Sequence, residues 1–459
     1  MSRPWTPLRV VHRHAGEILI LFLWFTLCGP TRQSILRTNW TWSLAFAALD
    51  AGSCWRGFVY FHVSDDKART ILVVLHDLPL GGTERVALRL ASQWARAGRS
   101  VTLLCGARQG ALAWLVDDAV KVVECDPPIP RGRGSRRRLS RAVAAFLADR
   151  PHDVLFVPGN YHWPVMQAAV RLPSSLRPAV VAQVSTPLFR HGRGPLKQIV
   201  YNWRTRRQFR GVDAAISLSP AMTDDADKVL GRRITQCIRL PALDDEDAGR
   251  LRTQASGKMI LAAGRLAEVK GFEVALRAFA HLADPDVRLV ILGEGPRREG
   301  LAALATALGV ADRVEFPGYV TDIRPWLEAA RVFLLSSYYE GYAAVVVEAL
   351  GAGRPVVSTN CTPAAFELLS KPEAGAVAPI GDAAALAARL RQVLAAPAPD
   401  PQRLAEMVAR YRIGPISAAY LRLFDTAKAR RHGLAPSSRP LTLTGPTFAA
   451  AAASSSQSA

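Results

Sequence analysis

Arg265 and Lys270 are the residues whose type and spacing most directly suit chemistry on an anion. They lie five residues apart in a segment bounded by Gly264 and Gly271, directly after the apolar run 259–263. Because both side chains belong to one loop, they can converge on one anion, the arginine as a bidentate fork and the lysine as a mobile point charge. Two cations beside a helix start suit a diphosphate leaving group without a metal; the alternative is a pair of ordinary exposed loop charges.

Two carboxylates, Glu340 and Glu348, follow further along the chain with seven residues between them. The apolar run 332–335 predicts a strand, so Glu340 falls in the loop after it and Glu348 lies one to two turns into the next helix. Both can then point into one crevice and bind ribose or hexose hydroxyls, while backbone N–H groups around 341–344 could meet phosphate. Two unrelated surface glutamates are the alternative.

A glycine pair, Gly81 and Gly82, stands between a predicted strand at 69–75 and a predicted helix at 83–97. Glycine lets the backbone approach a ligand closely, and a helix start offers unpaired N–H groups to phosphate or sugar oxygens. The pair does not form the GxGxxG dinucleotide fingerprint, and an ordinary tight turn is the alternative.

The elements that must position these residues form two α/β repeats. Short apolar runs rich in β-branched residues alternate with helical patterns, which predicts two doubly wound, Rossmann-like domains facing each other across a cleft. We expect an N-terminal, acceptor-side domain at 69–245, a polar linker within 243–257 and a C-terminal, donor-nucleotide domain at 256–400. A helical pattern at 401–424 predicts a segment, within 401–432, that returns to the first domain.

Composition and the chain ends limit the remaining possibilities. The 459 residues carry 58 Lys and Arg against 38 Asp and Glu, a net charge of +20, which favours polyanions such as an anionic membrane surface. Arginine clusters at 131–141 and 204–210 lack a nucleic-acid-reading motif, so we expect no nucleic-acid partner. Six scattered cysteines suit a reducing cytosol.

Residues 1–68, despite the apolar stretch 18–27, are expected to be an extension outside the fold, either non-native or disordered. Residues 433–459 are expected to be a disordered tail.

Together, the glycine pair, the segment Ala263-Gly-Arg-Leu-Ala-Glu-Val-Lys-Gly271 and the Glu-x7-Glu segment opening Glu340-Gly-Tyr342 resemble the retaining family-4 glycosyltransferases of GT-B fold. The resemblance covers about 70–425. It implies that Arg265 and Lys270 hold the donor diphosphate, Glu340 the transferred hexose and Glu348 the ribose. It also implies that the remaining donor contacts come from Gly81, Gly82, Gly293, Glu294, Val320, Gly341, Tyr342 and Ala343.

The chain departs from the family at one position. Many members carry a histidine in the first-domain loop that corresponds to 180–188, where it helps to stabilise the transition state; this chain has Gln183 and Ser185 instead. His76 and His162 are candidate replacements, the latter in a loop after a predicted strand, although a lone loop histidine is more often simply exposed. Asn160 is an equally plausible acceptor contact.

The resemblance implies transfer of a hexose from a UDP- or GDP-linked sugar to an acceptor hydroxyl, with retention by front-face attack and no protein nucleophile. No cofactor or metal is expected, because Arg265 and Lys270 neutralise the diphosphate and the acidic pairs at 225–227, 245–247 and 284–286 do not follow buried strands. We expect a glycan or lipid-linked acceptor in cell-envelope polysaccharide, lipopolysaccharide or glycolipid synthesis. The expected location is cytoplasmic, peripheral on the inner face of the membrane. The alternatives are a sugar-nucleotide epimerase of the same fold and a non-catalytic sugar-nucleotide or glycan-binding module.

Overall fold

The computed structural model describes residues 67–189, 193–250, 252–255 and 257–433. It also gives the backbone of two antiparallel strands, β1 (Trp42–Phe46) and β2 (Gly57–Phe61). The apolar stretch 18–27 and nearly all of the expected extension and tail lie outside the described residues. By its contacts the chain divides into two compact units, and Lys67–Arg431 is the one that contains the features below.

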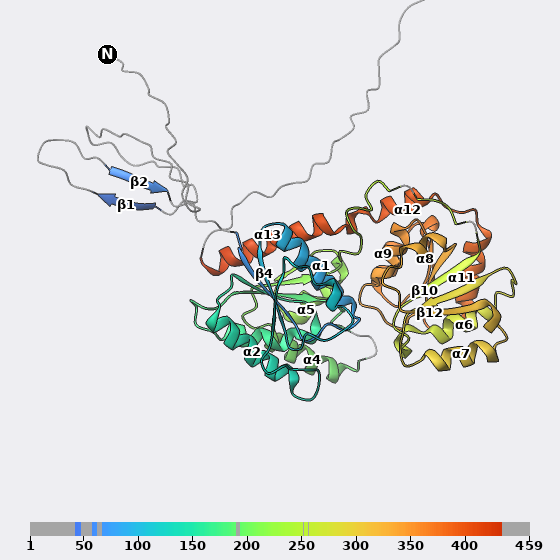
Figure 1. Ribbon diagram of the computed structural model, residues 1–459, viewed down its shortest axis with the longest axis horizontal. Helices are drawn as coiled ribbons and strands as arrows, with labels where there is room; N and C mark the ends of the chain where they lie inside the picture. Colours follow the sequence, from blue (N-terminus) through green and yellow to red (C-terminus); the bar gives the residue numbers. More distant parts are fainter. Residues whose placement is uncertain are drawn as a thin grey trace, which may run out of the picture. The chain divides into compact units, whose positions relative to one another are not determined.

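The first sheet has seven parallel strands in the order β5-β4-β3-β6-β7-β8-β9. Figure 1 labels its strand β4 and shows helices around the sheet. Its strands are β3 (Thr70–Leu75), β4 (Ser100–Cys105), β5 (Lys121–Glu124), β6 (Val154–Val157), β7 (Ala179–Val184), β8 (Ala214–Ser217) and β9 (Thr235–Cys237). Its helices are α1 (Gly82–Arg96), α2 (Ser135–Asp149), α3 (Met166–Val170), α4 (Pro195–Gln208) and α5 (Pro220–Leu230). The central strands β3, β6 and β7 are apolar almost throughout and buried along nearly their whole length, because helices cover both faces of a parallel sheet.

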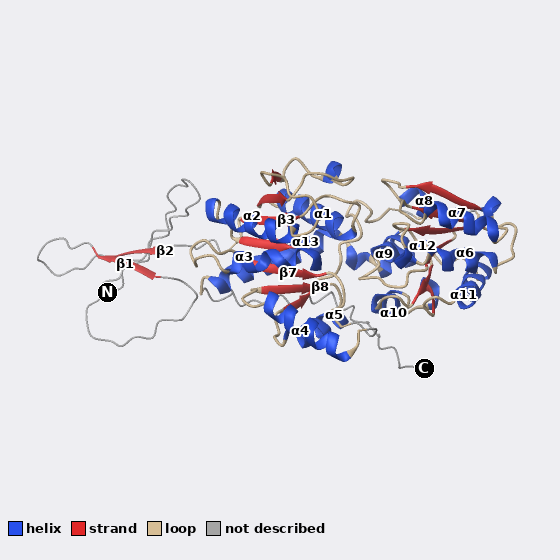
Figure 2. Cartoon of the chain, turned by 90° about the horizontal axis from the view of Figure 1, so that it is seen from below, coloured by secondary structure: helices blue, strands red, loops and turns tan. Residues whose placement is uncertain are grey.

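The second sheet has six parallel strands in the order β12-β11-β10-β13-β14-β15. Its strands are β10 (Met259–Ala263), β11 (Arg288–Leu292), β12 (Val314–Gly318), β13 (Val332–Leu335), β14 (Val356–Thr359) and β15 (Gly375–Ala378). Its helices are α6 (Phe272–Ala280), α7 (Arg298–Ala307), α8 (Arg324–Ala329), α9 (Ala344–Gly351), α10 (Pro363–Leu368) and α11 (Ala383–Ala395). Figure 2 shows the strands of both sheets enclosed by helices. The expected fold class, two doubly wound Rossmann-like domains, is confirmed.

The helical pattern at 401–424 divides into two helices, and the second continues to Arg431. The structure has α12 (Pro401–Met407), a short 3-10 turn at Ala409–Tyr411, and α13 (Ile413–Arg431). Proline fits only the first turn of a helix, so Pro415 forces a new helix to begin at Ile413. Helix α13 packs on α1 and β7, where Tyr420 and Phe424 join an aromatic cluster with Trp94.

Both sheets reverse their strand order at an internal position. In the first sheet the chain runs outward from β3 to β5 on one side and continues from β6 on the other; in the second the same reversal separates β10 from β13. Ligands of doubly wound sheets bind beyond the carboxyl ends of the strands at such a point. The loops that follow β3, β6, β10 and β13 are therefore the places to look for a site.

Candidate active site

Lys270 and Glu340, 70 residues apart in sequence, meet at the switch point of the second sheet. Lys270 follows β10 and Glu340 follows β13, and the Lys270 Nζ lies 2.7 Å from the Glu340 Oε1. The Ser337 hydroxyl donates to the same oxygen at 2.7 Å. Both charged side chains are largely but not fully buried, with exposed fractions of 25% and 14%. The structure thus brings together a cation and a carboxylate that the sequence places in separate motifs.

The two loops are locked to each other by backbone contacts. Gly271 has φ 59°, and a Cβ there would lie 2.3 Å from the Ser336 carbonyl oxygen, so only glycine fits this approach. The Ser336 hydroxyl donates to the Lys270 carbonyl at 3.0 Å, and the Tyr338 amide donates to the Val269 carbonyl at 2.9 Å. Lys270 and Glu340 are therefore held in place by the backbone on both sides.

Arg265 lies in the same loop as Lys270 and is exposed. It forms no ion pair or side-chain hydrogen bond with any residue that the structure describes. The loop carrying it lies against the loop after β11, because a Cβ at Gly293 would fall 2.0 Å from the Gly264 carbonyl oxygen. A cation left without a protein partner beside a neutralised Lys270–Glu340 pair is available to an anionic ligand.

The turns that contain the implied donor contacts Gly293, Glu294 and Val320 follow strands β11 and β12. The Gly293 amide donates to the Gly318 carbonyl at 2.7 Å, and the Leu266 amide donates to the Glu294 carbonyl at 2.9 Å. The Glu294 carboxylate is half exposed and pairs with Arg298 at 3.1 Å. Val320 is partly buried two residues beyond Gly318. Gly293 and Glu294 are thus held against the loop that carries Arg265.

The loop from Gly341 to Ala343 is anchored by a buried tyrosine side chain. The Tyr342 side chain is buried, and its hydroxyl lies 2.6 Å from the Tyr411 hydroxyl. Burial and the neighbouring Tyr411 hydroxyl raise the Tyr342 pKa above its ordinary value. Ala343 holds a left-handed φ of 60° as the residue before α9. Tyr342 anchors the loop through its hydroxyl, so only its backbone is left to meet a ligand.

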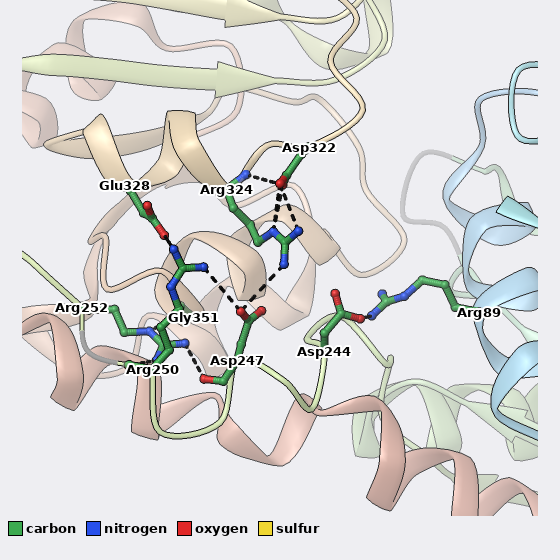
Figure 3. A network of polar contacts seen from close by, with 9 residues as sticks. All are labelled: Arg89, Asp244, Asp247, Arg250, Arg252, Asp322, Arg324, Glu328 and Gly351. Atoms are coloured by element: carbon green, nitrogen blue, oxygen red, sulfur yellow. Dashed lines mark hydrogen bonds and ion pairs between the residues drawn. The ribbon is translucent and has the colours of Figure 1, made fainter. Parts of the chain in front are cut away.

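Glu348 lies in the second turn of α9 and is held in a poorly solvated position. Burial raises the pKa of its carboxyl, and the guanidinium groups of Arg85 and Arg89 on α1 only partly oppose this shift. Arg89 instead forms an ion pair with Asp244 (Figure 3). No ion pair involves Glu348 among the described residues, so its carboxyl is a candidate acceptor for ligand hydroxyls.

The acidic segment expected to be a linker is anchored by arginines (Figure 3). The Asp247 carboxylate lies between Arg250 and Arg324, at 3.9 and 4.0 Å. Arg250 also pairs with Glu328 of α8 at 2.7 Å, and the Arg252 Nε donates to the Gly351 carbonyl at 2.9 Å. Described residues of this segment are therefore tied to α8 and to the end of α9.

The glycine pair lies at the switch point of the first sheet, and α1 begins at Gly82. A Cβ at Gly81 would lie 2.1 Å from the Glu84 carboxylate, which is buried. Arg131 donates to Glu84 at 2.9 Å and to Asp77 at 2.6 Å, and its guanidinium lies 4.4 Å from the Tyr161 ring centroid. The sequence predicts an open, positive helix start here, whereas the structure places a carboxylate in its first turn and balances it with Arg131.

Sequence reasoning missed this cluster because it treated Arg131 only as one member of a basic segment. The signal that could have identified it is a pair of acids on either side of the glycines, Asp77 two residues after β3 and Glu84 in the first helical turn. No spacing rule would have supplied the arginine, which comes from a separate loop 47 residues beyond Glu84.

His162 lies directly beneath the same turn. Its Nε2 accepts a hydrogen bond from the His76 amide at 3.1 Å, and its Nδ1 lies 3.2 Å from the Pro158 carbonyl, which fixes the proton on Nδ1. The side chain is 2% exposed, and burial lowers its pKa to about 4. His162 is therefore neutral and engaged by the backbone at both nitrogens, which suits positioning of the β3 and β6 loops.

The three residues predicted on the acceptor side lie together. The Asn160 side chain accepts from the Ser185 amide at 3.0 Å and donates to the Thr186 hydroxyl at 2.9 Å. Gln183 is buried, accepts from the Tyr420 hydroxyl at 2.9 Å and donates to the Ser185 hydroxyl at 3.3 Å. A Cβ at Gly341 would lie 2.4 Å from the Ser185 carbonyl oxygen, so the loop after β13 meets the loop after β7 here.

The acidic pairs set aside as metal ligands have protein partners. Asp225 accepts from the Leu188 amide at 2.6 Å, while Asp284 and Asp286 pair with Lys258. Within the described part of the chain, no group of three or more His, Cys, Asp and Glu side chains is arranged to hold a metal ion.

Two doubly wound sheets with polar loops at both switch points define the GT-B class of fold. Sucrose-phosphate synthase of Thermosynechococcus elongatus matches with a TM-score of 0.65 and 18% identity, covering 79% of this chain and all of that one. Anabaena HepE, solved in complex with UDP and glucose, matches with a TM-score of 0.63 and 20% identity, covering 78% of this chain and all of that one.

Matches to family models identify the family of the chain. The model for glycosyl transferases group 1 matches residues 257–396, and that for the glycosyl transferase 4-like domain matches 81–242, together well over half of the chain. The chain therefore belongs to the glycosyl transferases group 1, the family-4 glycosyltransferases. The lipopolysaccharide core biosynthesis glycosyltransferase LpsE of Rhizobium meliloti (strain 1021) is 34% identical over 227 residues, 47% of this chain and 65% of LpsE. The match thus spans slightly less than two thirds of that relative.

Proposed function

We propose that the chain is a retaining glycosyltransferase that moves a hexose from a UDP- or GDP-linked sugar to an acceptor hydroxyl without a metal. The observation that carries the proposal is the Lys270–Glu340 pair at the switch point of the second sheet, with the unpaired Arg265 in the same loop. A nucleoside diphosphate sugar presents both chemistries that this site would complement: a charged diphosphate for the cations and sugar hydroxyls for the carboxylate.

Donor binding would redistribute the charges of this pair. Lys270 and Arg265 would bind the diphosphate, and Lys270 would then stabilise the negative charge that develops as the glycosidic bond breaks. Glu340, still held by the Ser337 hydroxyl, would accept hydrogen bonds from the hexose. Glu348 would bind the ribose hydroxyls, which suits a partly buried carboxyl that forms no ion pair with any described residue.

Retention is proposed from the resemblance to family-4 enzymes, by front-face attack of the acceptor hydroxyl with no protein nucleophile. The first domain would supply positioning: the Arg131, Asp77 and Glu84 cluster fixes the glycine pair, and His162 fixes the loops beneath it. In this proposal His162 orients the site and does not touch the reacting atoms, because the backbone engages both of its nitrogens.

For the acceptor we propose a glycan or a lipid-linked glycan of the cell envelope, in polysaccharide, lipopolysaccharide or glycolipid synthesis. The relative LpsE, which is named for lipopolysaccharide core biosynthesis, supports this class. The proposed location is the cytoplasm and the inner face of the membrane. Among the described helices, none is long and apolar enough to cross a bilayer.

A second candidate function is a sugar-nucleotide-binding module without catalysis. The observation that favours it is the engagement of both ring nitrogens of His162 by the backbone, in a chain that has Gln183 and Ser185 where many family members carry a histidine. Donor hydrolysis separates the two, because a transferase cleaves its donor slowly even without an acceptor.

The test is a thermal-shift panel of UDP, GDP and their sugar conjugates on the full chain, with and without EDTA. Donors that stabilise the chain are then incubated with it, and nucleoside diphosphate release is followed. We expect one base to raise the unfolding temperature independently of EDTA, together with slow donor cleavage. Binding without cleavage would favour the module, and an effect abolished by EDTA would overturn the metal-free site.

A further inference from the structure

Helix α4 turns its apolar side to solvent. Leu196, Ile199, Val200 and Trp203 follow the spacing i, i+3, i+4, i+7, so they form one stripe along the helix. Their exposed fractions are 78%, 62%, 48% and 60%. They make up four of the twelve large apolar side chains that are exposed in the described part of the chain.

The buried side of the same helix is polar. Gln198 and Thr205 are its buried residues, and Gln198 is satisfied by Arg193 at 3.0 Å and Asn202 at 2.6 Å. A surface helix of a soluble domain normally does the reverse, burying its apolar stripe and exposing its polar one. The exposed stripe of α4 is therefore not explained by packing within its own domain, where α4 lies beside α5 (Figure 2).

Positive charge flanks the stripe and is not neutralised nearby in sequence. Residues 189–212 contain six arginines, one lysine and no acid. Arg207 lies 5.8 Å from the Trp203 ring centroid, at the end of the stripe. The sequence predicts an attraction of the segment 204–210 to polyanions, and the structure adds that this charge borders an exposed apolar surface.

A hollow of about 780 Å³ opens beside the end of α4. Its lining includes Trp203 and five arginines: Arg171, Arg206, Arg207, Arg210 and Arg232. None of these five forms an ion pair with a carboxylate among the described residues, although Arg206 is fixed by a bond to the Val229 carbonyl at 2.7 Å. Guanidinium groups that converge without carboxylates suit phosphate oxygens.

We propose that α4 is a membrane-docking helix that lies in the surface of an anionic bilayer. Leu196, Ile199, Val200 and Trp203 enter the boundary between headgroups and acyl chains, and the arginines of the hollow bind lipid phosphates. The stripe is apolar, and the residues beside it are basic with no acidic residue among them. An anionic bilayer complements both features, because its acyl chains are apolar and its headgroups carry negatively charged phosphates. The proposal names the element that carries the membrane association included in the proposed function, and it does not depend on catalysis.

The experiment is flotation of the full chain with vesicles of phosphatidylcholine and phosphatidylglycerol, compared with pure phosphatidylcholine vesicles. An apolar variant carries L196S, I199S, V200S and W203S, and its matched control carries W114S and F366S, which change two other side chains that are each 58% exposed. A charge variant carries R171Q, R207Q and R210Q, all in the lining of the hollow, and its matched control carries R137Q, R138Q and R141Q on the exposed side of α2.

We expect the apolar variant to lose at least about tenfold in partitioning to anionic vesicles and the charge variant about a hundredfold, while both controls bind like the unaltered chain. Equal binding by all variants would overturn the proposal, and so would an equal loss in the α2 control, which would indicate diffuse charge. A change from dimer to monomer in the apolar variant, measured by light scattering, would show that a second copy covers the stripe and would also overturn it.

Near-ultraviolet circular dichroism and the unfolding temperature show whether the variants remain folded. If the fourfold apolar variant is unfolded, the single substitutions I199S and W203S replace it in the flotation experiment. Donor cleavage in solution is measured in parallel. Vesicle binding lost with cleavage retained supports the docking helix, whereas absent cleavage with normal binding counts against the proposed transferase alone.

Discussion

Replacing Lys270 by Met tests the central claim about the site, because the change removes the charge and keeps most of the apolar stem. Removing one preorganised electrostatic group from an active site typically lowers the rate 10²- to 10³-fold, about 3 to 4 kcal/mol. We expect kcat/KM to fall by about that factor, chiefly through kcat, because the charge on the diphosphate grows as the bond breaks. The stability cost should be about 1 kcal/mol, since Lys270 and Glu340 remain partly exposed.

Lys258 provides the matched control. It stands immediately before β10, at the opposite end of the strand from Lys270, and pairs with Asp284 and Asp286. Lys258→Met removes the same charge from the same sheet, and we expect normal kcat/KM.

A structural role for Lys270 is tested in the Glu340→Gln background. If Lys270 serves only to neutralise Glu340, adding Lys270→Met to Glu340→Gln would cause no further loss of kcat/KM. Our reasoning requires a further loss, because the cation also acts on the diphosphate, and an unchanged rate in the double variant would refute it.

Three other substitutions test the structure around the site. The pKa of His162 is about 4 in the folded chain and about 6.5 for an ordinary histidine, so the unfolded chain binds more protons below about pH 6.5 and stability is lost as the pH falls. His162→Gln should remove about 2 kcal/mol of this loss between about pH 7.5 and pH 5 in urea unfolding, and an identical pH profile would count against the buried neutral imidazole. Gly271→Ala would place a Cβ 2.3 Å from a carbonyl oxygen at φ 59°, so we expect the free energy of unfolding to fall by about 1 to 3 kcal/mol. Gly82→Ala has open space around its Cβ and should leave the unfolding temperature unchanged. Equal unfolding temperatures for the two variants would contradict this difference. Tyr342→Phe leaves the buried Tyr411 hydroxyl without its partner, so we expect the free energy of unfolding to fall by about 1 to 3 kcal/mol while the donor affinity stays unchanged. Weaker donor binding at unchanged stability would instead show that the Tyr342 hydroxyl contacts the ligand.

Much of the fold could be predicted because parallel strands buried on both faces leave a strong local signal. The apolar runs at 69–75 and 259–263 correspond closely to β3 and β10, and the glycines and charges directly after them identified two of the four loops at the switch points. The end of the chain was harder, because the helical period at 401–424 does not show where α12 ends and α13 begins; Pro415 lies in the first turn of α13.

The sequence by itself determined which residue types stand at the carboxyl ends of the strands: Arg265, Lys270 and Glu340, with glycines where loops approach closely. This followed from local rules, because strand, turn and helix starts depend on neighbours in the chain. Only the tertiary structure decided which of these side chains meet. It joined Lys270 to Glu340 and Arg131 to Glu84, engaged the hydroxyl of Tyr342 and both ring nitrogens of His162, and turned the apolar side of α4 outward. Contacts across tens of residues and the direction of a helix face depend on strand order and packing, which periodicity along the chain does not encode.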